Sequence, residues 1–130
     1  MHNPAVVGRR GDVYCYIATR QEPASAGEYY GMARVPLSAF STFAVEILEY
    51  AQGLENGATA LARHNGYIYS FSDHLSGPKS IVGVSEETFS RVGSTVLEGS
   101  ASTGGPEVLK YHQRHLYACD DTQLWRVPVG

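Results

Sequence analysis

Three stretches of the chain share one pattern: a short apolar run, a polar turn, and a second apolar run centred on tyrosine. They read AVVGRRGDVYCY from Ala5, ATALARHNGYIYSF from Ala58 and EVLKYHQRHLYAC from Glu107. Short runs rich in Val, Ile, Tyr and Phe and bounded by Gly, Asn and Asp predict β-hairpins. The matched tyrosines are Tyr14, Tyr69 and Tyr117, spaced 55 and then 48 residues apart.

The similarity extends past the hairpins, where a polar loop leads into another apolar segment. At a constant offset of 49 residues, Phe40 matches Phe89, and the triplet at 47–49 matches the triplet at 96–98. Agreement at one offset over many positions indicates an internal duplication, whose units stack because none of them buries its apolar faces alone. The same place in the three apolar segments is held by Val35, Val84 and Val127.

Units one and two each read as four short strand-like segments joined by turns, and unit three reads as three. Unit one has segments 5–9, 12–19, 29–35 and 43–50, unit two has 58–63, 67–72, 80–85 and 94–98, and unit three has 107–111, 115–119 and 123–129. We therefore predict a single domain over residues 1–130 with an all-β fold, built from units at 4–54, 55–103 and 104–130. The last unit lacks its fourth strand.

The second strand of unit two is apolar on both faces, with Tyr67, Tyr69 and Phe71 on one face and Ile68 on the other. A sheet that is apolar on both faces must be covered on both. With the segment order and the aromatic strands NGYIYSF and RHLYAC, the chain resembles β-propeller repeats, without the WD40 or kelch signatures. The resemblance implies a β-propeller-like array of about three four-stranded units, and it carries over no catalytic residues.

One segment fits a helix better than a strand. In residues 38–54 the apolar side chains, among them Phe40, Phe43 and Ile47, recur with the spacing of an amphipathic helix. The matching segment of unit two makes a poor helix, because it carries Gly93 in its middle. We follow the repeat and predict a strand. The alternative is an α+β fold with one helix around residues 38–54.

Three units cannot close a propeller alone, since closed rings hold about four to eight blades. A homodimer supplies six units and closes the ring if unit one of each copy packs on unit three of the other. Pro128 suits the edge left by a missing fourth strand, because proline cannot donate to a ladder hydrogen bond. An open stack and a piece of a longer propeller are the alternatives.

Composition and charge agree with the predicted fold and exclude some classes of partner. With 43% hydrophobic residues, a net charge of -3 and scattered cationic residues, the chain is of ordinary globular type and has no basic stripe for nucleic acid. It shows neither a signal-peptide pattern nor an apolar run of membrane-helix length, so we expect a soluble cytoplasmic protein that does not bind membranes. The two cysteines, Cys15 and Cys119, are expected to be reduced and to face opposite sides of their sheets.

Polar side chains gather in the loops between second and third strands, where propellers commonly bind ligands. Mixed charges beside aromatic strands suit a small polar ligand such as a sugar, and ordinary solvated turns are the alternative interpretation. The candidate ligand-binding residues are Arg20, Glu22, Asp73, His74, Lys79, Asp120 and Asp121.

The usual signatures of enzymes, phosphate loops, zinc sites and EF-hands are missing, and we predict neither a metal nor a cofactor. We expect a noncatalytic β-propeller-like module that binds a small polar ligand or a protein partner, with the ring closed by homodimerisation. One alternative is a hydrolase or lyase that uses Asp73, Asp120 and Asp121, with His74 as acid or base. The other is a purely structural assembly unit.

Overall fold

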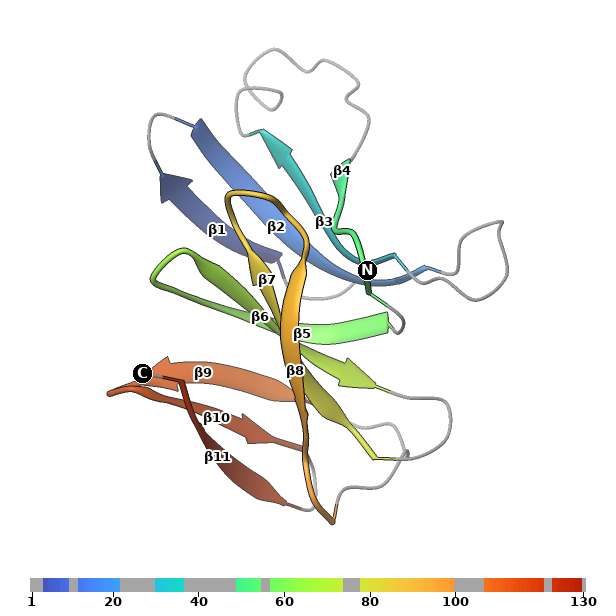
Figure 1. Ribbon diagram of the computed structural model, residues 1–130, viewed down its shortest axis with the longest axis vertical. Coiled ribbons are helices and arrows are strands. Elements are labelled where there is room, and N and C mark those ends of the chain that lie inside the picture. The colour runs from blue at the N-terminus through green and yellow to red at the C-terminus, as the bar shows by residue number, and fades with distance from the viewer. Residues whose placement is uncertain are drawn as a thin grey trace.

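The computed structural model describes residues 4–9, 12–21, 30–36, 49–54, 57–73, 78–99, 107–120 and 123–129. Over these residues the chain is all-β: eleven strands form three antiparallel sheets, and no helix is present. The sheets lie one above another in chain order, and none of them closes on itself (Figure 1). The predicted all-β class is therefore confirmed, and a closed propeller is not formed by these three sheets.

Each sheet is a meander in which a strand pairs with its neighbour in the sequence. The first sheet contains β1 (Pro4–Arg9), β2 (Asp12–Gln21), β3 (Tyr30–Pro36) and β4 (Glu49–Tyr50). The second contains β5 (Gly57–His64), β6 (Tyr67–Asp73), β7 (Ser80–Ser85) and β8 (Arg91–Val96). The third contains β9 (Val108–His112), β10 (His115–Cys119) and β11 (Leu124–Pro128). The two-residue turns between β5 and β6 and between β9 and β10 account for the antiparallel pairing of those strands.

Two hairpin turns use a left-handed backbone. Asn65 (φ 51°) and Gly66 (φ 85°) join β5 to β6, while Gln113 (φ 45°) and Arg114 (φ 68°) join β9 to β10. Positive φ at both central residues is typical of the hairpin turn whose twist matches that of the strands, and Asn-Gly is the preferred pair for it. The turn over residues 65–66 therefore follows directly from the local sequence.

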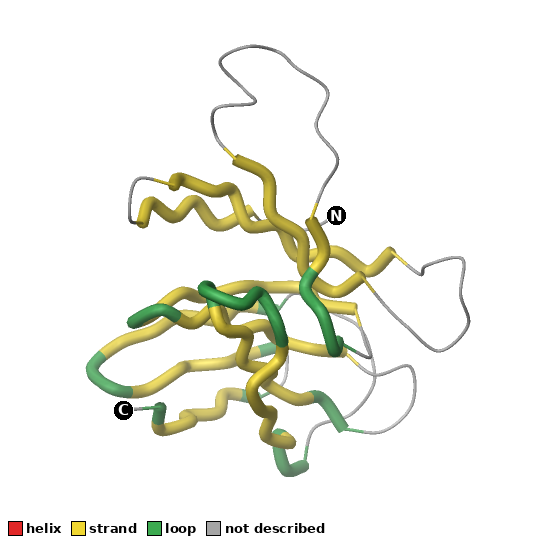
Figure 2. The backbone as a smooth tube through the Cα atoms, turned by 45° about the horizontal axis from the view of Figure 1, so that its top comes forward, coloured by secondary structure: helices red, strands yellow, loops and turns green. Residues whose placement is uncertain are grey.

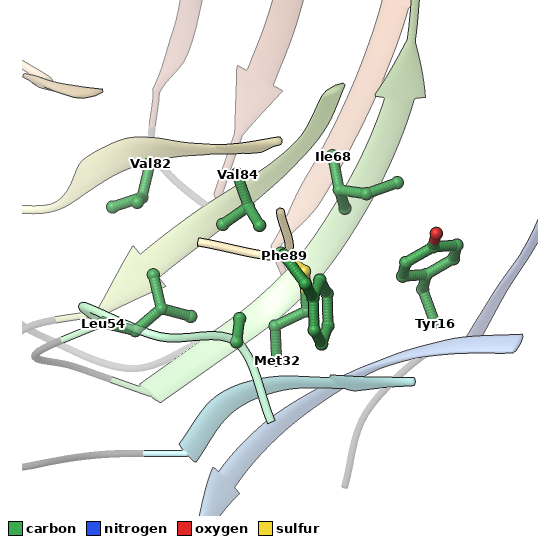
Figure 3. Close-up of a cluster of buried hydrophobic side chains, with 8 residues drawn as sticks. Tyr16, Met32, Leu54, Ile68, Val82, Val84 and Phe89 are labelled. Atoms are coloured by element: carbon green, nitrogen blue, oxygen red, sulfur yellow. The ribbon is translucent and has the colours of Figure 1, made fainter. Parts of the chain in front are cut away.

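The first and second sheets pack face to face around one hydrophobic cluster, here called the first interface (Figure 3). Tyr16 and Met32 of the first sheet meet Ile68 and Val84 of the second, and all four side chains are buried. Phe89, in the turn between β7 and β8, fills the space between the sheets, and its ring centroid lies 5.9 Å from that of Tyr16. Burying a side chain of this size contributes about 1.5–3 kcal/mol.

The second and third sheets pack around a separate cluster, the second interface. Phe71 and Ile81 of the second sheet lie against Leu109 and Leu116 of the third, and all four are buried. The Trp125 ring of β11 packs edge-on to Phe71 at 6.4 Å. Because Ile68 and Phe71 of β6 are buried on opposite faces, the prediction that this sheet is covered on both sides is confirmed.

The same kind of face of one sheet packs on the same kind of face of the next sheet in both interfaces. Side chains alternate between the faces of a strand, so the middle strands present one face with tyrosine, the tyrosine face, and one mainly aliphatic face. In the first interface the tyrosine face with Tyr16 packs on the aliphatic face with Ile68. In the second interface the tyrosine face with Tyr69 packs on the aliphatic face with Leu116. The sheets are therefore stacked head to tail. Figure 2 shows the backbone of the stack.

The outward-pointing face differs between the two ends of the stack. The aliphatic face of the first sheet points away from the second sheet, and its Cys15, Ile17 and Val35 form a small third cluster. Each of these three side chains is less than a tenth exposed. At the other end, the tyrosine face of the third sheet carries Tyr117 together with Cys119. The two cysteines thus lie on opposite kinds of face, as predicted.

Most strand predictions agree with the structure. Segments 80–85 and 115–119 are reproduced as β7 and β10, whereas the fourth segment of unit two, predicted at 94–98, runs from Arg91 to Val96. β11 lies at an edge of the third sheet, as Pro128 indicated. Most of the alternative helix over 38–54 falls on residues 38–48, which lie outside the described residues. Residues 49–50 form a strand.

Candidate functional site

Two of the seven candidate ligand-binding residues, Lys79 and Asp120, have described side chains, and the structure brings them together. Lys79 Nζ donates a hydrogen bond of 2.9 Å to Asp120 Oδ2. For the other five candidates no side chain is described: the backbones of Arg20 and Asp73 lie in β2 and β6, and Glu22, His74 and Asp121 lie outside the described residues.

Lys79 is the centre of a buried charge cluster between the second and third sheets. Its side chain is 0% exposed, and Nζ also lies 3.3 Å from Glu107 Oε2. The side chains of Glu107 and Asp120 are 1% and 5% exposed. One ammonium group therefore serves two buried carboxylates, one just before β9 and the other just after β10.

Both carboxylate oxygens of Asp120 are engaged. Oδ2 accepts the hydrogen bond from Lys79, and Oδ1 accepts one of 2.8 Å from the backbone N–H of Gln123. An aspartate held in this way links Gln123, just before β11, to Lys79, just before β7. This geometry accounts for Asp120 as a structural residue, because a general base needs an oxygen directed at a substrate proton.

The pKa of Lys79 is raised above its ordinary value. Burial acts to lower the pKa, but the hydrogen bond to Asp120 and the negative charge of Glu107 outweigh this effect. Lys79 therefore stays protonated at neutral pH and cannot act as a nucleophile or a base there. The cluster fits a fixed electrostatic link between two sheets.

A second polar group occupies the first interface, where Arg34 lies directly across from Tyr16 in the β2–β3 ladder. Its guanidinium carbon lies 4.3 Å from the ring centroid of Phe89 and 4.6 Å from that of Tyr14. The same group donates hydrogen bonds of 2.8 and 3.1 Å to the Glu49 carboxylate. Stacking on aromatic rings while binding a carboxylate is the geometry that arginine favours.

Arg34 also reaches across to the second sheet. Nη1 donates a 3.0 Å hydrogen bond to the backbone carbonyl of Glu86, and the Glu86 carboxylate in turn accepts a 2.6 Å hydrogen bond from Arg63. Arg34 thus binds both the ring of Phe89 and the backbone of the turn that carries it. The tyrosine face of the first sheet is therefore a receptor for this turn.

The exposed tyrosine face of the third sheet carries the same pair. Tyr117 on β10 lies directly across from Arg126 on β11, as Tyr16 lies across from Arg34. On its other side Tyr117 faces Lys110 of β9. Tyr117 is half-buried, and both cations are exposed.

Histidines and apolar residues flank this cationic row. The rings of His112 and His115 lie 6.5 and 6.3 Å from that of Tyr117. On the opposite side, Cys119 lies across from Val108 and Leu124, whose side chains are 44% and 70% exposed. Exposed valine and leucine side chains thus lie beside an aromatic and cationic row on this face.

Sequence reasoning did not select Glu107 or Arg34. A signal for Arg34 was present, since a cation in the middle of the apolar segment YGMARVP must find a partner when the strand is buried. Glu107 had no such signal, because its burial depends on Lys79, which is distant in the sequence.

Neither a metal site nor a membrane helix is found in the described part of the chain. Its His, Cys, Asp and Glu side chains form no group of three or more that could hold a metal ion. None of its elements is a helix long and apolar enough to cross a bilayer.

The comparisons with known proteins give no family. No protein-family model, no curated protein and no solved structure matches the chain significantly.

Proposed function

We propose that the protein is a noncatalytic β-propeller-like binding module whose partner is a second copy of the same chain. The tyrosine face of the third sheet is the docking surface, and the first-sheet end of the partner's stack is its target. Two copies arranged in this way continue the head-to-tail stack and bring six sheets into one ring, within the usual range for propellers.

One observation carries the proposal: the Tyr117–Arg126 pair on the third sheet repeats the Tyr16–Arg34 pair on the first. Within the chain, the Tyr16–Arg34 pair receives the turn with Phe89 from the next sheet. A surface that repeats this receptor is suited to a further sheet of the same kind. Tyrosine and arginine are also among the residues that most often dominate the binding energy of protein interfaces.

The energy of docking is expected to come mainly from the third sheet. Val108 and Leu124 expose apolar surface there that a partner would cover. Cys15, Ile17 and Val35 on the first sheet are already less than a tenth exposed, so further burial adds little at this end. The cationic heads of Lys110 and Arg126 can remain at the rim in water while their alkyl chains pack.

Binding of a small polar ligand, such as a sugar, at the loop residues remains a separate prediction. Lys79 and Asp120 bind each other, so a ligand there depends on the remaining candidates, Arg20, Glu22, Asp73, His74 and Asp121. No observation among the described residues favours the hydrolase or lyase alternative.

The proposal is tested with the double variant Tyr117→Ala/Arg126→Glu. Removing the ring and reversing the charge is expected to weaken the dimer by about 2 kcal/mol or more, a factor of roughly 30 in Kd. Sedimentation equilibrium of the wild type and the variant measures this difference. Circular dichroism checks that the fold is kept.

Val96→Glu is the matched control. Val96 is 51% exposed on β8, which belongs to neither end of the stack, so this charge should leave the dimer unchanged. An equal loss of affinity in Val96→Glu, or an unchanged Kd in the double variant, would show that the docking surface lies elsewhere.

A further inference from the structure

A cavity of about 370 Å³ opens in the second interface, between β8 of the second sheet and β11 of the third. One wall is the cross-strand pair of Tyr69 and Gly83, and the other is the end of the third sheet with Val127 and Val129. The lining is mostly apolar, and its volume lies within the range of about 300–1,000 Å³ found for small-molecule sites.

The cavity lies where Phe89 lies in the first interface. Phe89 packs on the cross-strand pair of Tyr16 and Arg34, and the corresponding pair on the second sheet is Tyr69 and Gly83. Both pairs join the second and third strands of their sheets, and both face the next sheet. The place that an aromatic ring fills in one interface is thus a cavity in the other.

The opposite walls correspond as well. Val84 belongs to the cluster around Phe89, and Val127, its match in the repeat, lines the cavity. After β11 the structure describes Val129. The described residues at this end of the third sheet place no aromatic side chain in the cavity that would correspond to Phe89.

Two glycines enlarge the space. Gly83 holds the position in the second sheet that Arg34, on which Phe89 stacks, holds in the first. A Cβ built on Gly83 would lie 3.5 Å from Tyr69 Cε1, which is an ordinary contact distance. Gly93 faces Gly83 across the β7–β8 ladder, and a Cβ built there would meet nothing within 4 Å. The floor of the cavity is therefore bare backbone, which lets a flat molecule approach closely.

We infer that this cavity binds an uncharged aromatic small molecule of one or two fused rings, in the place that the Phe89 ring takes in the first interface. Tyr69 offers its ring for edge or offset packing, as Tyr16 does for Phe89. The lining contains no charged residue, which disfavours an ionised ligand. The site lies within one chain and does not depend on dimerisation.

Indole is a suitable probe, because it has two fused rings and no charge. Titration of ¹⁵N-labelled wild type with indole is expected to shift the amide resonances of Gly83, Gly93 and Val127 together, with a Kd below about 1 mM for so small a ligand. Absence of any shift at these three amides up to the solubility limit of indole would overturn the inference.

Filling the cavity from within provides the mutational test. Gly93→Phe places a ring in the cavity without a backbone clash, since the built Cβ has open space. This variant is expected to lose indole binding by at least about tenfold and to unfold at a higher temperature than the wild type. Gly93→Leu fills less of the space, so it should weaken indole binding and raise the unfolding temperature by less than Gly93→Phe does.

Val96→Phe is the control for these variants. Val96 lies on the same strand, is exposed, and does not line the cavity, so Val96→Phe should bind indole as the wild type does. Indole affinity that falls equally in Val96→Phe and Gly93→Phe, or that is unchanged in a folded Gly93→Phe, would place the aromatic ligand elsewhere.

Discussion

Replacing Lys79 by methionine is expected to lower the free energy of unfolding by about 3–5 kcal/mol, because it leaves two buried carboxylates without their cation. Methionine keeps most of the side-chain length, so the change removes charge rather than volume. Lys79 has no exposed surface, and water cannot replace the lost ammonium group without opening the second interface. Urea denaturation of the wild type and Lys79→Met measures the difference.

The triple variant Lys79→Met/Glu107→Gln/Asp120→Asn separates charge from packing. It removes every charge of the cluster, and uncharged amides cost far less to bury than carboxylates that have lost their cation. It is therefore expected to recover more than half of the loss in Lys79→Met. A triple variant as unstable as Lys79→Met would contradict the electrostatic explanation.

The stabilisation by Lys79 also has a defined pH dependence. Since its folded pKa is raised, the contribution is fully present below the ordinary lysine value of 10.5 and is lost as the pH rises through the folded pKa. The stability difference between wild type and Lys79→Met should therefore stay constant around neutral pH and shrink above pH 10.5.

Phe89→Ala is expected to lower the free energy of unfolding by about 3–5 kcal/mol, the usual result of removing a buried aromatic ring. Phe89 is 1% exposed and contacts both Tyr16 and Arg34, so its loss leaves a cavity at the centre of the first interface. Thermal and urea denaturation measure the loss.

Tyr67→Ala is the matched control for Phe89→Ala. Tyr67 is an aromatic residue of the same sheet but is 41% exposed, so its truncation should lower the free energy of unfolding by less than about 1 kcal/mol. Equal losses in the two variants would show that Phe89 does not join the sheets. Phe89→Leu should lie between them, since leucine fills part of the space.

The strands were predictable where turn residues bracket an apolar run. Gly66 and Asn65 define the start of β6, and the limits of β7 and β10 follow from the polar residues around them. The limits of β8 were predicted less well: the strand was expected at 94–98 and runs from Arg91 to Val96. In the structure Gly93 is a regular ladder residue opposite Gly83.

The candidate site was predictable only in part, because its contacts join distant segments. Lys79 and Asp120 were both selected from their loops, but they are 41 residues apart, and no local pattern pairs them. The docking face depends on which side of β10 and β11 is covered. That follows from the stacking order of whole sheets rather than from the pattern within one strand.

The mass of the wild-type protein in solution distinguishes a homodimer from a single chain. Two chains in one ring predict a mass twice that of the single 14.1 kDa chain by light scattering coupled to gel filtration, with a shift toward 14.1 kDa only on strong dilution. A mass of 14.1 kDa at every concentration up to the solubility limit would contradict the proposal that a second copy completes the array.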